Sequence, residues 1–242
     1  IGLRITNETE YKAWNTNVNG VKRQRGSVNT ADEGFFGAIN LLAPRPPNSV
    51  LHWHADLTFV QLRFEFVRSS SSEMAVTIAH TFVTFYDFDA GAGDTGVECM
   101  MLEPHSPHVH SLQTSLVTDI TLTSNWGGWT DPQQHAWSNG TLACASQYGV
   151  GRDNPAIPDR LTISEQRKAL MVELVDVHSL IVRHAIVGCC STGRNFLFAV
   201  RHSSRSSNLY LPTYRASSPV SFVACSPRGR WIDTVLRRVT RM

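Results

Sequence analysis

Short runs of β-forming residues, separated by turn residues, constrain the fold of this chain more than any other feature. In residues 57–67 polar and apolar side chains alternate over the full length of a strand. Further candidate strands, rich in Val, Thr, Phe and Tyr, cover residues 75–89, 97–102, 112–123, 142–148, 169–175, 179–187 and 195–200. No long amphipathic helix lies between them, which argues against βαβ units. The sequence therefore predicts an all-β fold, an antiparallel, jelly-roll-like β-sandwich with long loops.

Residues 1–202 form the predicted sandwich domain, and residues 203–242 form a basic tail rich in Ser and Arg. Within the tail, apolar residues recur at helical spacing and arginines fall largely on the opposite side, which predicts a short C-terminal docking helix. Its candidate contact residues are Trp231, Val235, Leu236, Arg237 and Arg238. Such a helix docks on a protein or covers a sheet edge, or it lies on an anionic membrane surface; the first two are favoured. A second, very short helix is predicted at Thr162–Glu165, which has the spacing of a capping box.

Charge and composition exclude several classes of protein. The net charge is +2, so no overall positive field attracts nucleic acid. No run of about 18 apolar residues is present, so no transmembrane segment is expected. The glycosylation sequons at Asn7 and Asn139 and five cysteines fit a protein that is secreted, on the cell surface or in an organelle lumen. Cys144 and Cys225 are candidate disulfide partners for the adjacent Cys189 and Cys190.

Three blocks of the sequence are similar to a known group of proteins. They are TFYDFD at residues 84–89 with Glu98, GVGRDNP and the residues that follow it at 149–166, and RNFLFA at 194–199. With these blocks the chain resembles β-rich proteins of dinoflagellates and related algae over about residues 1–200. The resemblance implies a secreted or surface-associated sandwich and carries no enzymatic activity with it.

Four acidic residues form the strongest candidate for a metal site: Asp87, Asp89, Asp94 and Glu98. Residues two apart on a strand share a face, so Asp87 and Asp89 are expected to present two carboxylates together. A glycine-rich turn at residues 91–96 is then expected to return Glu98 to the same end of the sheet as a hairpin partner. Carboxylates beside a loop that offers carbonyl groups suit calcium. The alternative is a solvated hairpin end with no ion.

Two loops are candidates for ligand binding. Trp126 and Trp129 lie in a long glycine-containing loop and could stack on sugar rings or anchor the loop on the sandwich. In the loop that begins at Gly149, the candidate ligand contacts are Arg152, Asp153 and Asn154. Ordinary loop chemistry explains this second segment equally well.

These features favour a non-enzymatic binding module, stabilised by calcium, that recognises a glycan or a protein through its loops. One alternative is a structural subunit of a larger protein assembly. A further alternative is a polysaccharide hydrolase, in which Asp87 and Glu98 face one cleft. No nucleophile elbow or other catalytic signature is present in the sequence, so no catalytic residue is assigned.

Overall fold

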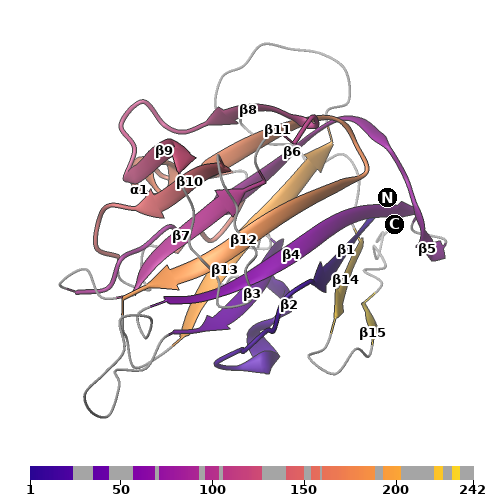
Figure 1. Cartoon of the computed structure of the whole chain (residues 1–242), viewed down its shortest axis with the longest axis horizontal. Coiled ribbons are helices and arrows are strands. Elements are labelled where there is room, and N and C mark those ends of the chain that lie inside the picture. The colour runs from indigo at the N-terminus through magenta and orange to yellow at the C-terminus, as the bar shows by residue number, and fades with distance from the viewer. Residues whose placement is uncertain are drawn as a thin grey trace, which may run out of the picture.

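The computed structural model describes residues 1–23, 35–43, 57–68, 71–92, 96–103, 106–126, 140–149, 154–158, 160–188, 193–202, 221–225 and 231–234. Within these residues, two β-sheets pack face to face (Figure 1). The predicted all-β sandwich is therefore confirmed. The helical residues that the structure describes are confined to two very short segments, η1 (Thr16–Val18) and α1 (Ile163–Arg167). Neither is long and apolar enough to cross a membrane.

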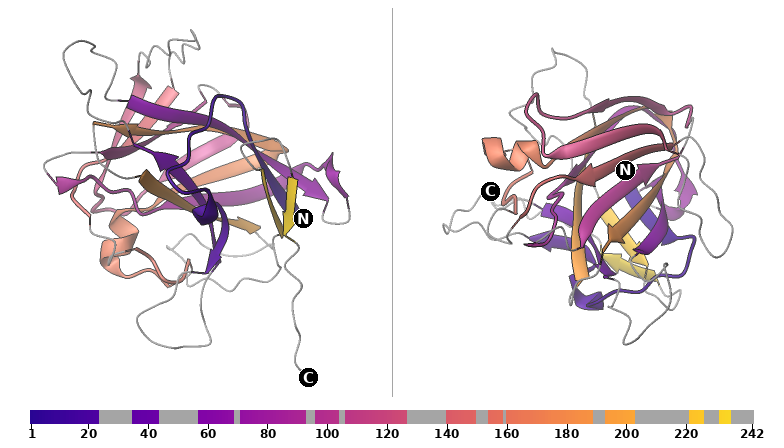
Figure 2. Two further views of the ribbon diagram at one scale, coloured as in Figure 1. Left: turned by 90° about the horizontal axis from the view of Figure 1, so that it is seen from below. Right: turned by 60° about the vertical axis from the view of Figure 1, so that its left-hand side comes forward.

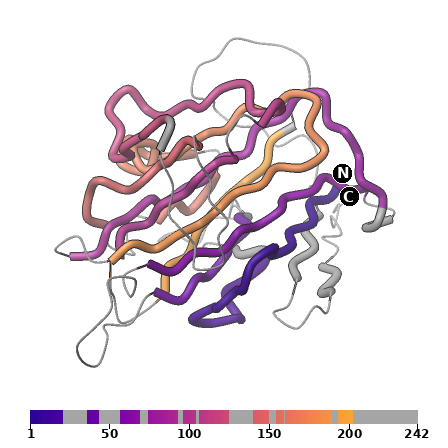
Figure 3. Tube along the Cα trace, in the orientation of Figure 1, coloured from indigo at the N-terminus to yellow at the C-terminus, as the bar shows by residue number. Residues whose placement is uncertain are grey.

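The larger sheet contains nine strands, in the order β15-β14-β1-β4-β12-β7-β10-β9, with β5 paired to β4. Their bounds are β1 (Gly2–Asn7), β4 (Leu57–Arg68), β5 (Ser71–Ala75), β7 (Val97–Leu102), β9 (Ile120–Trp126), β10 (Gly140–Ala145), β12 (Ser179–Val187), β14 (Ser221–Cys225) and β15 (Trp231–Thr234). Neighbouring strands run antiparallel, except that β1 and β14 are parallel. Figure 3 shows how distant segments meet, since β4 runs beside β12.

The smaller sheet contains six strands, in the order β2-β3-β13-β6-β11-β8. Their bounds are β2 (Gly20–Arg23), β3 (Phe35–Leu42), β6 (Ile78–Tyr86), β8 (Val109–Gln113), β11 (Leu170–Val177) and β13 (Gly193–His202). The two further views in Figure 2 show the sheets as layers, with α1 projecting at one end.

The main core lies between the two sheets and is built from the inward side of the alternating strands. Phe64 of β4 is fully buried, and its ring centroid lies 5.1 Å from that of Phe198 on β13 and 5.9 Å from that of Phe85 on β6. Edge-to-face packing of this kind adds to the stabilisation from the buried area. His184 of β12 lies among the same rings. The alternation that predicted β4, β6 and β12 therefore marks the residues that join the two layers.

Two expectations about strand pairing were wrong. The strand expected at residues 75–89 is shorter than predicted, since β6 covers only residues 78–86. In addition, β7 is not the hairpin partner of β6, because β7 pairs with β10 and β12 in the other sheet. Residues 112–123 are not one strand either. They divide between β8 and β9, which belong to opposite sheets. In both places the chain crosses from one layer to the other, and an alternating pattern does not record which sheet a residue joins.

The C-terminal helix expected from Trp231 onward is contradicted over its first turn. Residues 231–234 form β15, an extended strand that pairs antiparallel with β14. Strand β14 in turn continues the larger sheet beyond β1, so two short segments of the predicted tail belong to that sheet. Val235, Leu236, Arg237 and Arg238 lie outside the described residues.

One disulfide bond joins neighbouring strands of the larger sheet. Cys99 of β7 is bonded to Cys144 of β10, directly opposite it in the antiparallel register. The partners expected for Cys144, Cys189 or Cys190, were therefore wrong. Those two cysteines lie outside the described residues.

Candidate functional site

The structure brings together three of the four predicted acidic residues. Asp87 and Asp89 follow β6, while Glu98 lies in β7, and the three are 6%, 4% and 3% exposed. The backbone N–H of Glu98 donates a hydrogen bond to the carbonyl oxygen of Asp89 at 3.0 Å. Asp94 lies outside the described residues.

The acidic residues meet for a different reason from the one predicted. β6 ends at Tyr86, so Asp87 and Asp89 are not on a strand face. Asp87 instead has a φ of 65°, in the left-handed region, which aspartate tolerates better than most residues. The chain turns here to leave the smaller sheet, and both carboxylates are carried into the interior.

Two basic side chains from distant segments neutralise the carboxylates. The ammonium group of Lys168, which follows α1, lies 2.6 Å from Oδ1 of Asp89. Nε of Arg194, at the start of β13, lies 3.9 Å from Oε1 of Glu98. Both pairs are largely removed from water, where an unpaired charge would be strongly destabilising. The cluster therefore satisfies much of its charge with residues of its own chain.

Electrostatics favour a protonated Glu98. Burial raises the pKa of Glu98 well above its ordinary value, and the negative charge of Asp87 raises it further. The positive charge of Arg194 acts in the opposite direction, lowering the pKa. Burial and the neighbouring carboxylates therefore disfavour the ionised form of Glu98, while Lys168 and Arg194 supply positive charge beside Asp89 and Glu98.

The second candidate loop packs directly on this cluster. A Cβ atom on Gly149 would lie 1.8 Å from Oδ1 of Asp89, so only glycine allows this approach. Residues 90 and 148 form an isolated bridge, and the N–H of Gly149 donates to the carbonyl of Ala90 at 3.2 Å. The residues after β10 are thereby attached to the residues after β6, a contact that no sequence pattern predicts.

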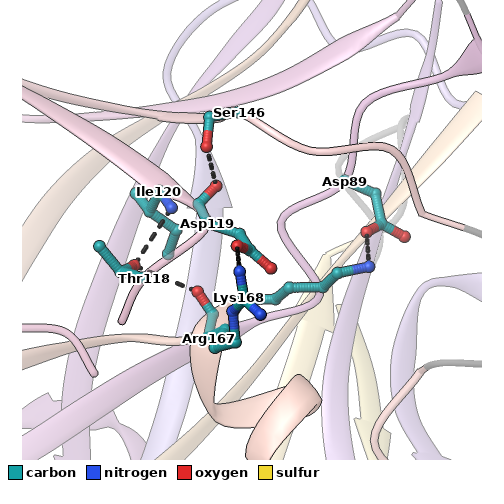
Figure 4. A network of polar contacts seen from close by, with 7 residues as sticks. All are labelled: Asp89, Thr118, Asp119, Ile120, Ser146, Arg167 and Lys168. Carbon is teal, nitrogen blue, oxygen red and sulfur yellow. Dashed lines mark hydrogen bonds and ion pairs between the residues drawn. The ribbon is translucent and has the colours of Figure 1, made fainter. Parts of the chain in front are cut away.

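A second network extends the same end of the sandwich (Figure 4). The guanidinium of Arg167 lies 2.6 Å from Oδ1 of Asp119, and the carbonyl of Arg167 accepts hydrogen bonds from the N–H of Asp119 and the hydroxyl of Thr118. The hydroxyl of Ser146 donates to the carbonyl of Asp119 at 2.8 Å. Residues 87–92, 114–119, 145–149 and 160–168 are thus tied together, and we call these four segments the α1 end.

Exposed apolar side chains are concentrated at the α1 end. Leu116, Val117, Tyr148 and Ile163 are each more than half exposed, and all four belong to segments that the networks join. The buried Lys168–Asp89 pair lies beneath this end, and its surface carries the four apolar side chains beside exposed polar ones such as Ser146, Thr162 and Ser164. The exposure of these apolar residues was not predicted, because they lie in segments that were expected to be strands or a helical turn, where apolar side chains usually face the core.

Of the other residues predicted for ligand binding or glycosylation, the structure describes Asn7, Asn154 and the backbone of Trp126. Asn154 is half-buried, and the backbone of Trp126 closes β9, while Trp129, Arg152, Asp153 and Asn139 lie outside the described residues. Asn7 is exposed at the end of β1, and its side-chain nitrogen donates to the carbonyl of Thr9 at 3.0 Å. Exposure leaves Asn7 accessible at the surface.

A separate polar group on the smaller sheet lacks the order of a catalytic triad. The hydroxyl of Ser111 donates to Oε2 of Glu173 at 2.6 Å, and Nε2 of His80 lies 2.8 Å from Oε1 of the same carboxylate. The serine hydrogen bond contributes most to lowering the pKa of Glu173. The carboxylate stands between serine and histidine, whereas a triad needs histidine in that place.

The part of the chain that the structure describes contains no preformed metal-binding site. There, no group of three or more His, Cys, Asp or Glu residues is arranged to hold a metal ion. Comparison of the chain with family models, with curated proteins and with solved structures finds no match. The resemblance to the algal proteins stays a prediction.

Proposed function

We propose that this chain is a non-enzymatic interaction module of an extracellular or lumenal space, and that it binds a protein partner through the α1 end. One observation carries the proposal: four apolar side chains are exposed on segments that buried hydrogen bonds and ion pairs hold together. They are Leu116, Val117, Tyr148 and Ile163. Contiguous apolar surface on a soluble domain is typical of sites of protein contact. A base held by buried ion pairs presents such side chains with little loss of conformational entropy on binding.

The compartment is inferred from the Cys99–Cys144 bond, because disulfides persist mainly where the environment is oxidising. The exposed sequon at Asn7 agrees with this setting. Glycan recognition and polysaccharide hydrolysis receive less support. Asp87 and Glu98, the carboxylates that hydrolysis would use, are both buried, and Glu98 is paired with Arg194 of the same chain, so a polymer cannot reach them without rearrangement.

The proposal is tested by photo-cross-linking of the full chain in its native secretory setting. A photoreactive phenylalanine analogue replaces Leu116 in one variant and Met74 in the other, since Met74 is an exposed apolar residue of β5, outside the α1 end. We expect discrete protein adducts from position 116 and not from position 74. Equal labelling of both positions, or none at position 116 in a folded protein, contradicts the proposal.

A further inference from the structure

Strand β9 forms an open edge of the larger sheet. It stands last in the strand order, and within the described residues it pairs with β10 alone. The side chains of Thr121, Leu122, Thr123 and Ser124 are all exposed. The outward backbone N–H and C=O groups of such a strand are a template on which another strand can add.

The composition of β9 lacks the features that usually protect an edge. Its seven residues, ITLTSNW, contain no charge and no proline. By contrast, β2 at one edge of the smaller sheet contains Lys22 and Arg23, and β15 at the far edge of the larger sheet contains Asp233. An uncharged strand can pair with a copy of itself without placing like charges opposite each other.

Leu122 lies on the side of β9 that faces the core, but it is not fully covered by the other sheet. Leu122 lies opposite Ala143 in the register, and Ile120, two residues earlier, lies on the same face. Ala143 and Ile120 are buried in the core between the sheets, whereas Leu122 is 41% exposed. A strand added beside β9 would cover the exposed part of Leu122.

The segment before β9 enlarges the same surface. Leu116 and Val117 precede β9 by a few residues, and the hydrogen bonds of Thr118 and Asp119 to Arg167 fix their attachment to α1. Asp119 is the only acidic or basic residue in the stretch 109–126 other than His110, and it is paired with Arg167. The open edge and the apolar residues Leu116 and Val117 are therefore continuous in the chain, and the one charged carboxylate of this stretch is paired.

We propose that a second copy of this chain pairs antiparallel with β9, so that the two larger sheets join across a two-fold axis. A two-fold axis places the same surface on both sides, which suits a strand with no charge of its own. Leu122 then faces the corresponding strand of the other copy, and Leu116 and Val117 lie at the margin of the interface. This inference rests on the proposed function, because it names the protein that the α1 end binds.

The test is the mass of the purified full chain in solution, measured by light scattering and sedimentation over a wide concentration range. The wild type is expected to approach twice the monomer mass of 26.9 kDa as its concentration rises. Leu122→Lys places a charge opposite its own copy and is expected to weaken dimerisation at least tenfold. Met74→Lys, the matched control on β5, is expected to leave it unchanged. Thermal unfolding of both variants establishes that they are folded.

A wild type that stays monomeric at all concentrations, or a folded Leu122→Lys variant that dimerises as the wild type does, overturns the inference. If the wild type is monomeric and position 116 still cross-links to a different protein, self-pairing fails while the proposed function stands. If no dimer and no adduct are found, both fail.

Discussion

The ammonium group of Lys168 lies 2.6 Å from Oδ1 of Asp89, with both side chains buried at the end of the sandwich where four segments meet. The two residues are 79 positions apart in the sequence. Asp89 follows β6 of the smaller sheet, and its neighbour Glu98 belongs to the larger one. This ion pair therefore contributes to holding the α1 end in place across both layers.

Removing the cation of this pair should be costly. Lys168→Met leaves a buried carboxylate without its partner, which typically destabilises a protein by about 3–5 kcal/mol. The pair of Arg63 and Glu8 is a control on the surface, because the two side chains are 40% and 25% exposed. Arg63→Met should cost about 1 kcal/mol or less through its charge. Denaturant unfolding of both variants measures the difference, and equal losses would show that the buried pair has no special weight.

The raised pKa of Glu98 predicts a pH-dependent contribution to stability. A carboxyl whose pKa is higher in the folded than in the unfolded state stabilises the fold most at low pH, and this contribution is lost as pH rises through the folded pKa. Glu98→Gln keeps the shape of the neutral acid and cannot ionise. The free energy of unfolding of the variant, relative to the wild type, should therefore increase as the pH rises above 4.5, the ordinary pKa of glutamate. A constant difference across this range would contradict a raised pKa.

His184 should change the pH dependence of stability in the opposite direction to Glu98, because it destabilises the fold as the pH falls. Its ring is fully buried near Phe85 and Phe196, with no hydrogen-bond partner for either nitrogen among the described residues, and burial lowers its pKa from 6.5 to about 3. Below pH 6.5, the pKa of this histidine in the unfolded chain, the unfolded chain binds a proton that the folded chain does not bind. The free energy of unfolding therefore decreases as the pH falls. Each pH unit in that interval corresponds to about 1.4 kcal/mol.

The test replaces His184 by leucine, which has a similar volume and no titratable group. At neutral pH the variant should be at least as stable as the wild type, because a buried polar ring without hydrogen bonds is replaced by hydrocarbon. At about pH 4.5 its advantage should be larger by about 2–3 kcal/mol. Parallel stability curves for the two proteins from neutral pH to about pH 4.5 would mean that His184 is protonated in the fold.

Sequence alternation predicted the strands well where one side of a strand faces the core. β12 has the bounds expected from residues 179–187, and β4 extends the expected 57–67 by one residue. The prediction was wrong at residues 114–119, which were included in one strand, whereas the chain crosses there from β8 in one sheet to β9 in the other. The crossing is fixed by hydrogen bonds to Arg167, which is distant in sequence. A local pattern cannot contain such a contact.

The candidate site was predicted in part. Asp87, Asp89 and Glu98 do lie together, but in a crossover between sheets and not in a hairpin. Their partners Lys168 and Arg194 were missed, because each is set by the pairing of strands that are far apart in the chain. The capping box at Thr162 and Glu165 was predicted, since both of its hydrogen bonds are local. Its short helix brings Lys168 towards Asp89.

Calcium provides a direct test of how the acidic cluster is neutralised. To bind Asp89, a calcium ion would have to displace Lys168 from Oδ1, and it would compete with the proton that Glu98 favours. We therefore expect the thermal midpoint of the wild type to be the same in calcium and in chelator. An ion present at 100 times its dissociation constant would instead add about 2.7 kcal/mol of stability, a shift that is easily measured.

If calcium does raise the midpoint, the variant Asp89→Asn decides where the ion binds. Loss of the effect in that variant would place the ion at the cluster, and an unchanged effect would place it elsewhere in the chain.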